Sequence, residues 1–101
     1  MMDYQSFVDE VNRRLENAID IGGGETVWFT ETSDEAEWRR EAYAVRLSRY
    51  SDGGVIVAMF FDNKRCGQGH ALIMDDIGAN SVVDMVIDHA GGRDRRVTTI
   101  R

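Results

Sequence analysis

Proline is absent from the sequence, cysteine occurs once, and no long apolar run is present. The lone Cys66 cannot form a disulfide within the chain, which is typical of a reducing compartment. The longest apolar run is Val55 to Phe61, whereas a membrane-spanning helix needs about 20 residues. The N-terminus lacks the basic and apolar segments of a secretory signal. We therefore expect a cytoplasmic protein that makes no contact with a membrane.

Basic residues are also scarce, because 12 Lys and Arg stand against 18 Asp and Glu, giving a formal net charge of −6. Such a chain repels phosphate backbones on average, so we expect no direct binding of nucleic acid. The hydrophobic fraction of 43% and the charged fraction of 30% are typical of globular proteins. A length of 101 residues suits a single domain, residues 1–101, with one core.

Two segments have the apolar spacing of amphipathic helices. The first runs from Tyr4 to Ile19, with Asp3 or Ser6 as its N-cap and a glycine stop at 22–24. The second runs from Ala79 to Ala90, and Asn80 or Ser81 stands at its expected N-cap.

Strands are expected between these helices. The β-branched and aromatic content of 26–30, the alternation from Tyr43 to Leu47 and the apolar run 55–61 each predict a strand. The segment 64–74 predicts a fourth strand that glycines interrupt, and 97–100 a short C-terminal strand. Ser33 to Glu41 has helical propensity, so we expect an acidic loop or a short helix there. The order predicts an α+β fold: an antiparallel meander of three to four strands, with both helices packed on the same face.

This order of elements resembles the double-stranded-RNA-binding domain, with Gly67 to Ala71 at the place of that family's glycine-bearing loop. The family holds phosphates with a lysine pair at the start of its second helix, where this sequence has Asp75 and Asp76. The resemblance therefore implies a shared topology without RNA binding. The acidic α+β format also resembles, more loosely, type III secretion chaperones.

Cys66 and His70 are the residues most suggestive of chemistry, since a thiol and an imidazole four positions apart could bind a metal or act as nucleophile and base. Structural zinc needs four ligands, and the sequence offers only His89 besides, with no second cysteine. Asp84 and Asp88 fit a solvated helix face. We therefore expect no enzyme, no metal and no cofactor.

Acidic residues surround Trp38 in the middle of the sequence, and a second acidic pair precedes the second helix. A large aromatic beside charges has the composition of a protein-binding hot spot, although a Trp in the core is equally compatible with the pattern. The candidate partner-binding residues are Glu31, Asp34, Glu35, Glu37, Trp38, Glu41, Asp75 and Asp76.

From this composition we expect a small acidic, non-enzymatic binding protein that inhibits or masks a basic protein, one whose basic groove holds nucleic acid. Inhibitors from phages and mobile elements, anti-CRISPR proteins among them, and toxin-immunity proteins work in this manner. The alternative is a homodimeric secretion chaperone or adaptor that uses a sheet edge or a helix flank. The sequence leaves open whether the protein is a monomer or a homodimer.

Overall fold

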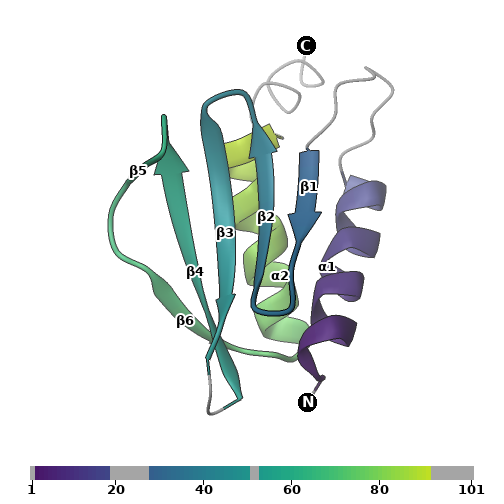
Figure 1. Ribbon diagram of the computed structural model, residues 1–101. Helices are drawn as coiled ribbons and strands as arrows, with labels where there is room; N and C mark the ends of the chain where they lie inside the picture. The colour runs from purple at the N-terminus through teal and green to yellow at the C-terminus, as the bar shows by residue number, and fades with distance from the viewer. Residues whose placement is uncertain (1, 19–27, 51–52, 92–101) are drawn as a thin grey trace.

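The computed structural model describes residues 2–18, 28–50 and 53–91 (Figure 1). Its elements are, in chain order, α1 (Tyr4–Ala18), β1 (Trp28–Glu31), β2 (Glu35–Arg40), β3 (Tyr43–Arg49), β4 (Gly54–Phe61), β5 (Lys64–Arg65), β6 (His70–Ile73), α2 (Asp76–Met85) and a π-helical continuation, η2 (Val86–Gly91).

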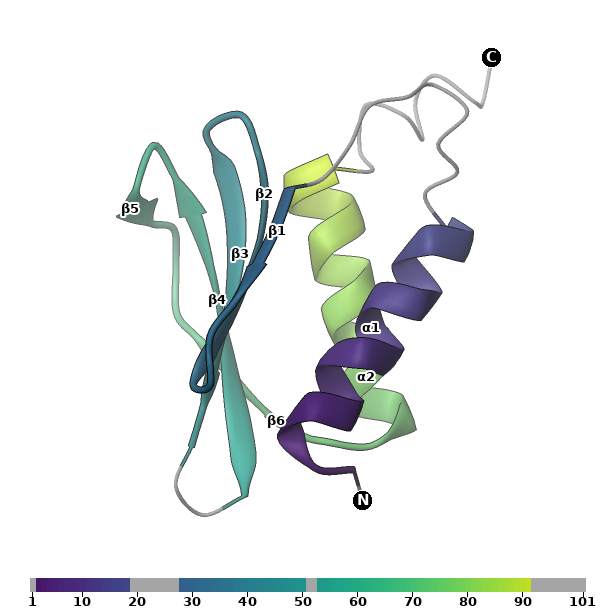
Figure 2. The ribbon, with the colours of Figure 1, turned by 45° about the vertical axis from the view of Figure 1, so that its right-hand side comes forward.

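The strands form one antiparallel sheet in the order β1-β2-β3-β4, and both β5 and β6 pair with β4 on its other side. Both helices pack on the same face of this sheet, as Figure 2 shows. The expected α+β fold is therefore confirmed, including the fourth strand, which residues 66–69 divide into β5 and β6. The expected C-terminal strand 97–100 and the glycine stop 22–24 lie outside the described residues.

Helix α1 forms as its apolar spacing predicts. Asp3 is the cap, because its Oδ1 accepts a hydrogen bond from the Ser6 N–H at 2.8 Å. This bond also lowers the pKa of Asp3, since it favours the ionised carboxylate. The apolar stripe of α1 is buried against the sheet and α2, through Tyr4, Phe7, Val8, Val11 and Leu15.

The segment expected as an acidic loop or short helix is instead a strand, β2, and that expectation is wrong. Ala36 and Trp38 are buried while Glu35 is exposed and Glu37 half-buried, which is the period of two that a strand with one covered face requires. β2 pairs along its whole length with β3, from Glu35 opposite Ser48 to Arg40 opposite Tyr43. Ladder pairing with a neighbouring strand outweighs the weak helical propensity of the acidic residues.

Helix α2 begins earlier than its apolar spacing predicts. Asp75, not Asn80 or Ser81, is the N-cap, and its side chain accepts from the Gly78 N–H at 2.9 Å. The apolar spacing does not indicate the first turn, because the large apolar residue of that turn, Ile77, is exposed and does not lie on the buried face of the helix.

One arginine joins the two helices. Arg14 on α1 donates from Nε to Glu10 (2.6 Å) and from its Nη atoms to the Asp76 carboxylate (2.6 Å) and Asn80 Oδ1 (2.8 Å) on α2. Arg13 also pairs with Glu10. Hydrogen bonds from Arg13 and Arg14 lower the pKa of Glu10 to about 2. The bridge lies at the outer edge of the helix pair, so it orients α1 and α2 without burying a charge.

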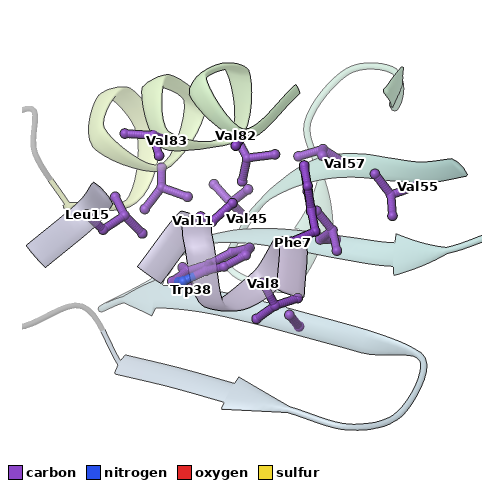
Figure 3. Packing of buried hydrophobic residues seen from close by; sticks show 14 of the residues in the cluster. Phe7, Val8, Val11, Leu15, Trp38, Val45, Val55, Val57, Val82 and Val83 are labelled. Atoms are coloured by element: carbon purple, nitrogen blue, oxygen red, sulfur yellow. The ribbon is translucent and has the colours of Figure 1, made fainter. Parts of the chain in front are cut away.

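The core lies between the helix pair and the inner face of the sheet (Figure 3). α1 contributes Phe7 and Val11, α2 contributes Val82, and the sheet contributes Trp38 and Val57, all with at most 1% of their surface exposed. Nothing polar or charged is fully buried among the described residues. Neither of the described helices covers the outer face of the sheet (Figure 2).

The closest approach of α2 to the sheet generates a stability prediction at Gly78. A Cβ added there would lie 2.0 Å from the carbonyl oxygen of Ile73, which is backbone and cannot turn away. Gly→Ala inside a helix ordinarily stabilises by up to about 1 kcal/mol, but here we expect Gly78→Ala to destabilise by about 1 to 3 kcal/mol, the usual cost of overpacking. Denaturant unfolding measures this, with Asp84→Ala on the exposed face of α2 as control. A stabilised Gly78→Ala variant would contradict the packing.

The arginine bridge predicts a pH dependence. The folded-state pKa of Glu10, about 2, lies below its ordinary 4.5, so the carboxylate stabilises the fold above about pH 4.5 and this stabilisation is lost as the pH falls towards 2. Unfolding free energies of wild type and Glu10→Gln should therefore differ by a constant amount above that window and converge within it. Asp9→Asn, on the same helix, is the control. Parallel curves for wild type and Glu10→Gln through the window would contradict the bridge.

Candidate functional site

The connection between β1 and β2 is a short hairpin tip that its own hydrogen bonds hold in shape. The Thr32 N–H donates to the Glu35 carbonyl oxygen at 2.7 Å. The Thr32 hydroxyl oxygen accepts from the N–H groups of Glu35 (3.0 Å) and Asp34 (3.3 Å). Threonine at this position therefore fixes the backbone that carries the neighbouring acids.

The hairpin tip is also held against the body of the molecule. The Arg49 N–H at the end of β3 donates to the Asp34 carbonyl oxygen at 2.9 Å, and the Tyr4 hydroxyl at the start of α1 donates to the Thr32 carbonyl oxygen at 3.4 Å. The Arg49 guanidinium lies 5.7 Å from the centre of the Tyr4 ring. The tip is thus positioned by two other elements, α1 and β3.

Three carboxylates gather at this tip, and we call Glu31, Asp34 and Glu35 the acidic tip. Burial of Tyr4 and the negative charges of Glu31, Asp34 and Glu35 raise the pKa of its phenol to about 12, and the charge of Arg49 opposes the shift. Asp34 and Glu35 are exposed and Glu31 is half-buried. Asp34 and Glu35 therefore present negative charge to solvent on a fixed backbone, whereas Oε2 of Glu31 is buried.

Glu37 does not belong to this negative surface. It points to the uncovered face of the sheet, where its carboxylate accepts from Arg39 Nε at 2.8 Å and from Arg46 Nε at 3.1 Å. The Arg46 guanidinium also lies 4.3 Å from the centre of the Phe60 ring. Two cations thus surround one anion, so the middle of this face is not acidic.

Trp38 belongs to the core, the second of the two alternatives that the sequence leaves open. Its side chain is 1% exposed, and its indole N–H donates to Asn12 Oδ1 of α1 at 2.7 Å. Its ring centre lies 5.5 Å from that of Phe29 on β1. Trp38 is therefore a structural anchor for the hairpin, and its side chain is not available to a partner.

The remaining candidate acids lie apart from the tip. Glu41 is exposed in the turn between β2 and β3, with a φ of 57°, and the length of β2 separates it from Asp34 by roughly 20 Å at about 3.3 Å per residue. Asp75 caps α2 and Asp76 pairs with Arg14. These two acids stand where the double-stranded-RNA-binding domain has its lysine pair, and each of them contacts another residue of this chain.

Cys66 and His70 lie on the edge of the sheet formed by β5 and β6. Cys66 is exposed, and its Sγ lies 3.6 Å from the Lys64 carbonyl oxygen. His70 is exposed on β6, whereas His89 on η2 lies with its Nε2 2.8 Å from the Phe60 carbonyl oxygen. Across residues 2–18, 28–50 and 53–91, no three His, Cys, Asp or Glu side chains group as metal ligands.

The structure adds residues to the site that sequence reasoning missed. Tyr4 and Arg49 support the tip, and the exposed Asp3 lies close enough to Arg49 for that charge to lower its pKa. Their spacing in the sequence carries no signal, because only the packing of α1 beside the hairpin brings residues 3, 4, 32 and 49 together.

Comparisons with protein families, with curated proteins and with solved structures give no match for this chain. No helix in the described part of the chain is long and apolar enough to cross a bilayer.

The pKa of the Tyr4 phenol is raised mainly by burial and further by the negative charges of the acidic tip, so it responds to the charge of the tip. Replacing Asp34 with Asn and Glu35 with Gln removes two of the negative charges that raise the phenol pKa, so the Tyr4 pKa should fall from about 12 towards its ordinary value of 10. Ultraviolet absorbance follows the titration, with a Tyr4→Phe variant to subtract the other tyrosines. An unchanged Tyr4 titration would show that the carboxylates do not gather around this ring.

Proposed function

We propose that this chain is a small, non-enzymatic, acidic binding protein that masks a basic protein partner through its acidic tip. The partner surface is a basic groove of the kind that holds nucleic acid, with carboxylates of the tip in the place of phosphates. This is the mode of phage and mobile-element inhibitors, including anti-CRISPR proteins, and of toxin-immunity proteins. The chain itself would make no contact with nucleic acid, because its net charge of −6 repels phosphates.

One observation carries the proposal: Asp34 and Glu35 are exposed on a backbone that hydrogen bonds fix at both sides of the tip, and the half-buried Glu31 adds its charge from the end of β1. Surface acids scattered over a protein contribute mainly to solubility. A rigid group of them loses little conformational entropy when it binds, so more of the electrostatic attraction remains as affinity.

Electrostatic complementarity would act mostly on the rate of association. Opposite potentials steer two proteins together, and like charges placed across an interface cost several kcal/mol, so the tip would also reject acidic surfaces. Salt should weaken the effect, since the Debye length falls from about 10 Å at 0.1 M to about 3 Å at 1 M.

The test compares two charge-reversed variants with the same net charge. Asp34→Lys with Glu35→Lys reverses the exposed part of the acidic tip, whereas Glu41→Lys with Asp84→Lys reverses two exposed acids elsewhere. A partner is first captured with the wild-type protein from lysate of its source cells, and its affinity for all three proteins is then measured. We expect the tip variant to lose at least tenfold in affinity, about 1.4 kcal/mol, and the control to change little.

Circular dichroism and thermal unfolding confirm that both variants fold, because exposed substitutions usually change stability by under about 0.5 kcal/mol. Equal losses in the two variants would show that net charge alone drives binding. Full affinity in the tip variant would remove the tip from the interface and contradict the proposal.

The alternative, a homodimeric chaperone or adaptor, differs from this function in its oligomeric state. The observation that favours a homodimer is the composition of the β6 edge of the sheet, which does not involve the acidic tip.

A further inference from the structure

The hydrogen-bonding pattern of β4 determines which backbone groups of its neighbour β6 point to the outer edge of the sheet. The Tyr50 N–H donates to the Gly54 carbonyl oxygen at 2.8 Å, so even-numbered residues of β4 bond towards β3. Odd-numbered residues bond towards the other side, as the Cys66 N–H does to the Met59 carbonyl oxygen at 2.8 Å.

The residues of β4 that bond to β6 are therefore Val55 and Val57. Their partners on β6 are Leu72 and His70, respectively. Alternate residues of an antiparallel strand point their backbone groups in opposite directions. The N–H and C=O groups of Ala71 therefore point away from β4, at the outer edge of the sheet. No described strand pairs with that edge.

The side chains of β6 include none of those that usually keep an edge strand from pairing with another chain. The strand reads His-Ala-Leu-Ile, without the Lys, Pro or inward charge that usually keeps edge strands from pairing. Ile73 at its end is 62% exposed, and Ile77 in the first turn of α2 is 77% exposed. Two large aliphatic side chains in solvent next to an unpaired strand are typical of an interaction surface.

We propose that β6 pairs with β6 of a second copy of this chain, antiparallel about a two-fold axis at Ala71. A strand that pairs with itself in antiparallel orientation satisfies the same groups on both copies, so the contact closes as a dimer. The sheet then continues through both subunits, with the helices of both on the same side.

The register follows from which backbone groups are free. The Ile73 carbonyl oxygen already accepts from the Asp75 N–H at 2.9 Å and faces the start of α2, whereas neither backbone group of Ala71 has a partner among the described residues. Pairing Ala71 with Ala71 of the second copy uses both and places Ile73 opposite Gly69 of the second copy. Gly69 has no side chain of its own, but the Arg65 guanidinium lies 2.5 Å from where its Cβ would be, so the end of this flexible side chain turns aside when the isoleucine of the second copy packs there.

Charge favours a second copy as the occupant over an unrelated strand. Lys64 and Arg65 form the exposed β5 before β6, and Asp76, which pairs with Arg14 of its own subunit through Oδ1 and keeps 81% of its side chain exposed, follows β6. Antiparallel pairing brings the basic end of one edge to the acidic end of the other, twice in the dimer. β1 and β2 lie towards the opposite edge, so the dimer leaves the acidic tip uncovered and does not depend on the proposed function.

The first test is the mass in solution. Sedimentation equilibrium of the full chain should show the mass rising from 11.4 kDa towards twice that value as the concentration increases up to about 1 mM. Ile73→Lys, a charge at the exposed end of β6, should weaken the dimer at least tenfold. Thr30→Lys places the same charge on β1 at the other edge and should leave it intact.

The second test is the register. In a Cys66→Ser background, Ala71→Cys should form an intermolecular disulfide under mild oxidation, because Cα atoms of a hydrogen-bonded antiparallel pair lie about 5.5 Å apart, within disulfide range. Thr30→Cys in the same background controls for random collision. Lys64→Glu with Arg65→Glu should weaken the dimer as Ile73→Lys does.

A monomer at every concentration would overturn the proposal. So would a dimer that Thr30→Lys weakens as much as Ile73→Lys, or one in which Thr30→Cys crosslinks as readily as Ala71→Cys. Loss of this dimer would leave the partner binding of the acidic tip unaffected, so the two proposals fail separately.

Discussion

Trp38 is buried under α1, and this burial determines the register of β2 and the direction of its side chains. Because side chains of a strand alternate between the two faces, placing Trp38 in the core fixes Ala36 beside it and sends Glu35 and Glu37 outward. A slip of one residue would bury two carboxylates and expose the indole. The hydrogen bond from the indole to Asn12 ties this register to α1, and α1 in turn brings Tyr4 to the hairpin tip.

The sequence predicts the fold well in segments whose apolar residues follow a single period, either that of a helix or that of a strand. The stripe of α1, the alternation of β3 and the apolar β4 each match one kind of element, and all three form as expected. β2 could not be predicted in this way because its acids and arginines favour a helix locally, and only two of its residues are buried. The start of α2 could not be predicted for a related reason, since its Ile77 is exposed and lies off the buried stripe, and Gly78, a poor helix former, stands where the Ile73 carbonyl oxygen leaves no room for a Cβ.

The sequence indicates the acidic composition of the candidate site but not the arrangement of its residues in space. The sequence shows many acids near Trp38, yet the fold separates them into the acidic tip, the paired Glu37 on the uncovered face and the distant Glu41. Whether a carboxylate is free or paired depends on cross-strand neighbours such as Arg46, which lies opposite Glu37 in the register. The supporting role of Tyr4 and Arg49 depends on tertiary packing alone.

We propose that a basic partner covers the acidic tip and that the overall negative charge alone does not determine where it binds. Hydrogen–deuterium exchange of the protein with and without its captured partner locates the covered surface. We expect the slowed amides in residues 31–36 and at the start of α1, while those of η2 and the turn at Glu41 exchange as before. Protection confined to the uncovered face of the sheet, around Arg46 and Phe60, would contradict the proposal.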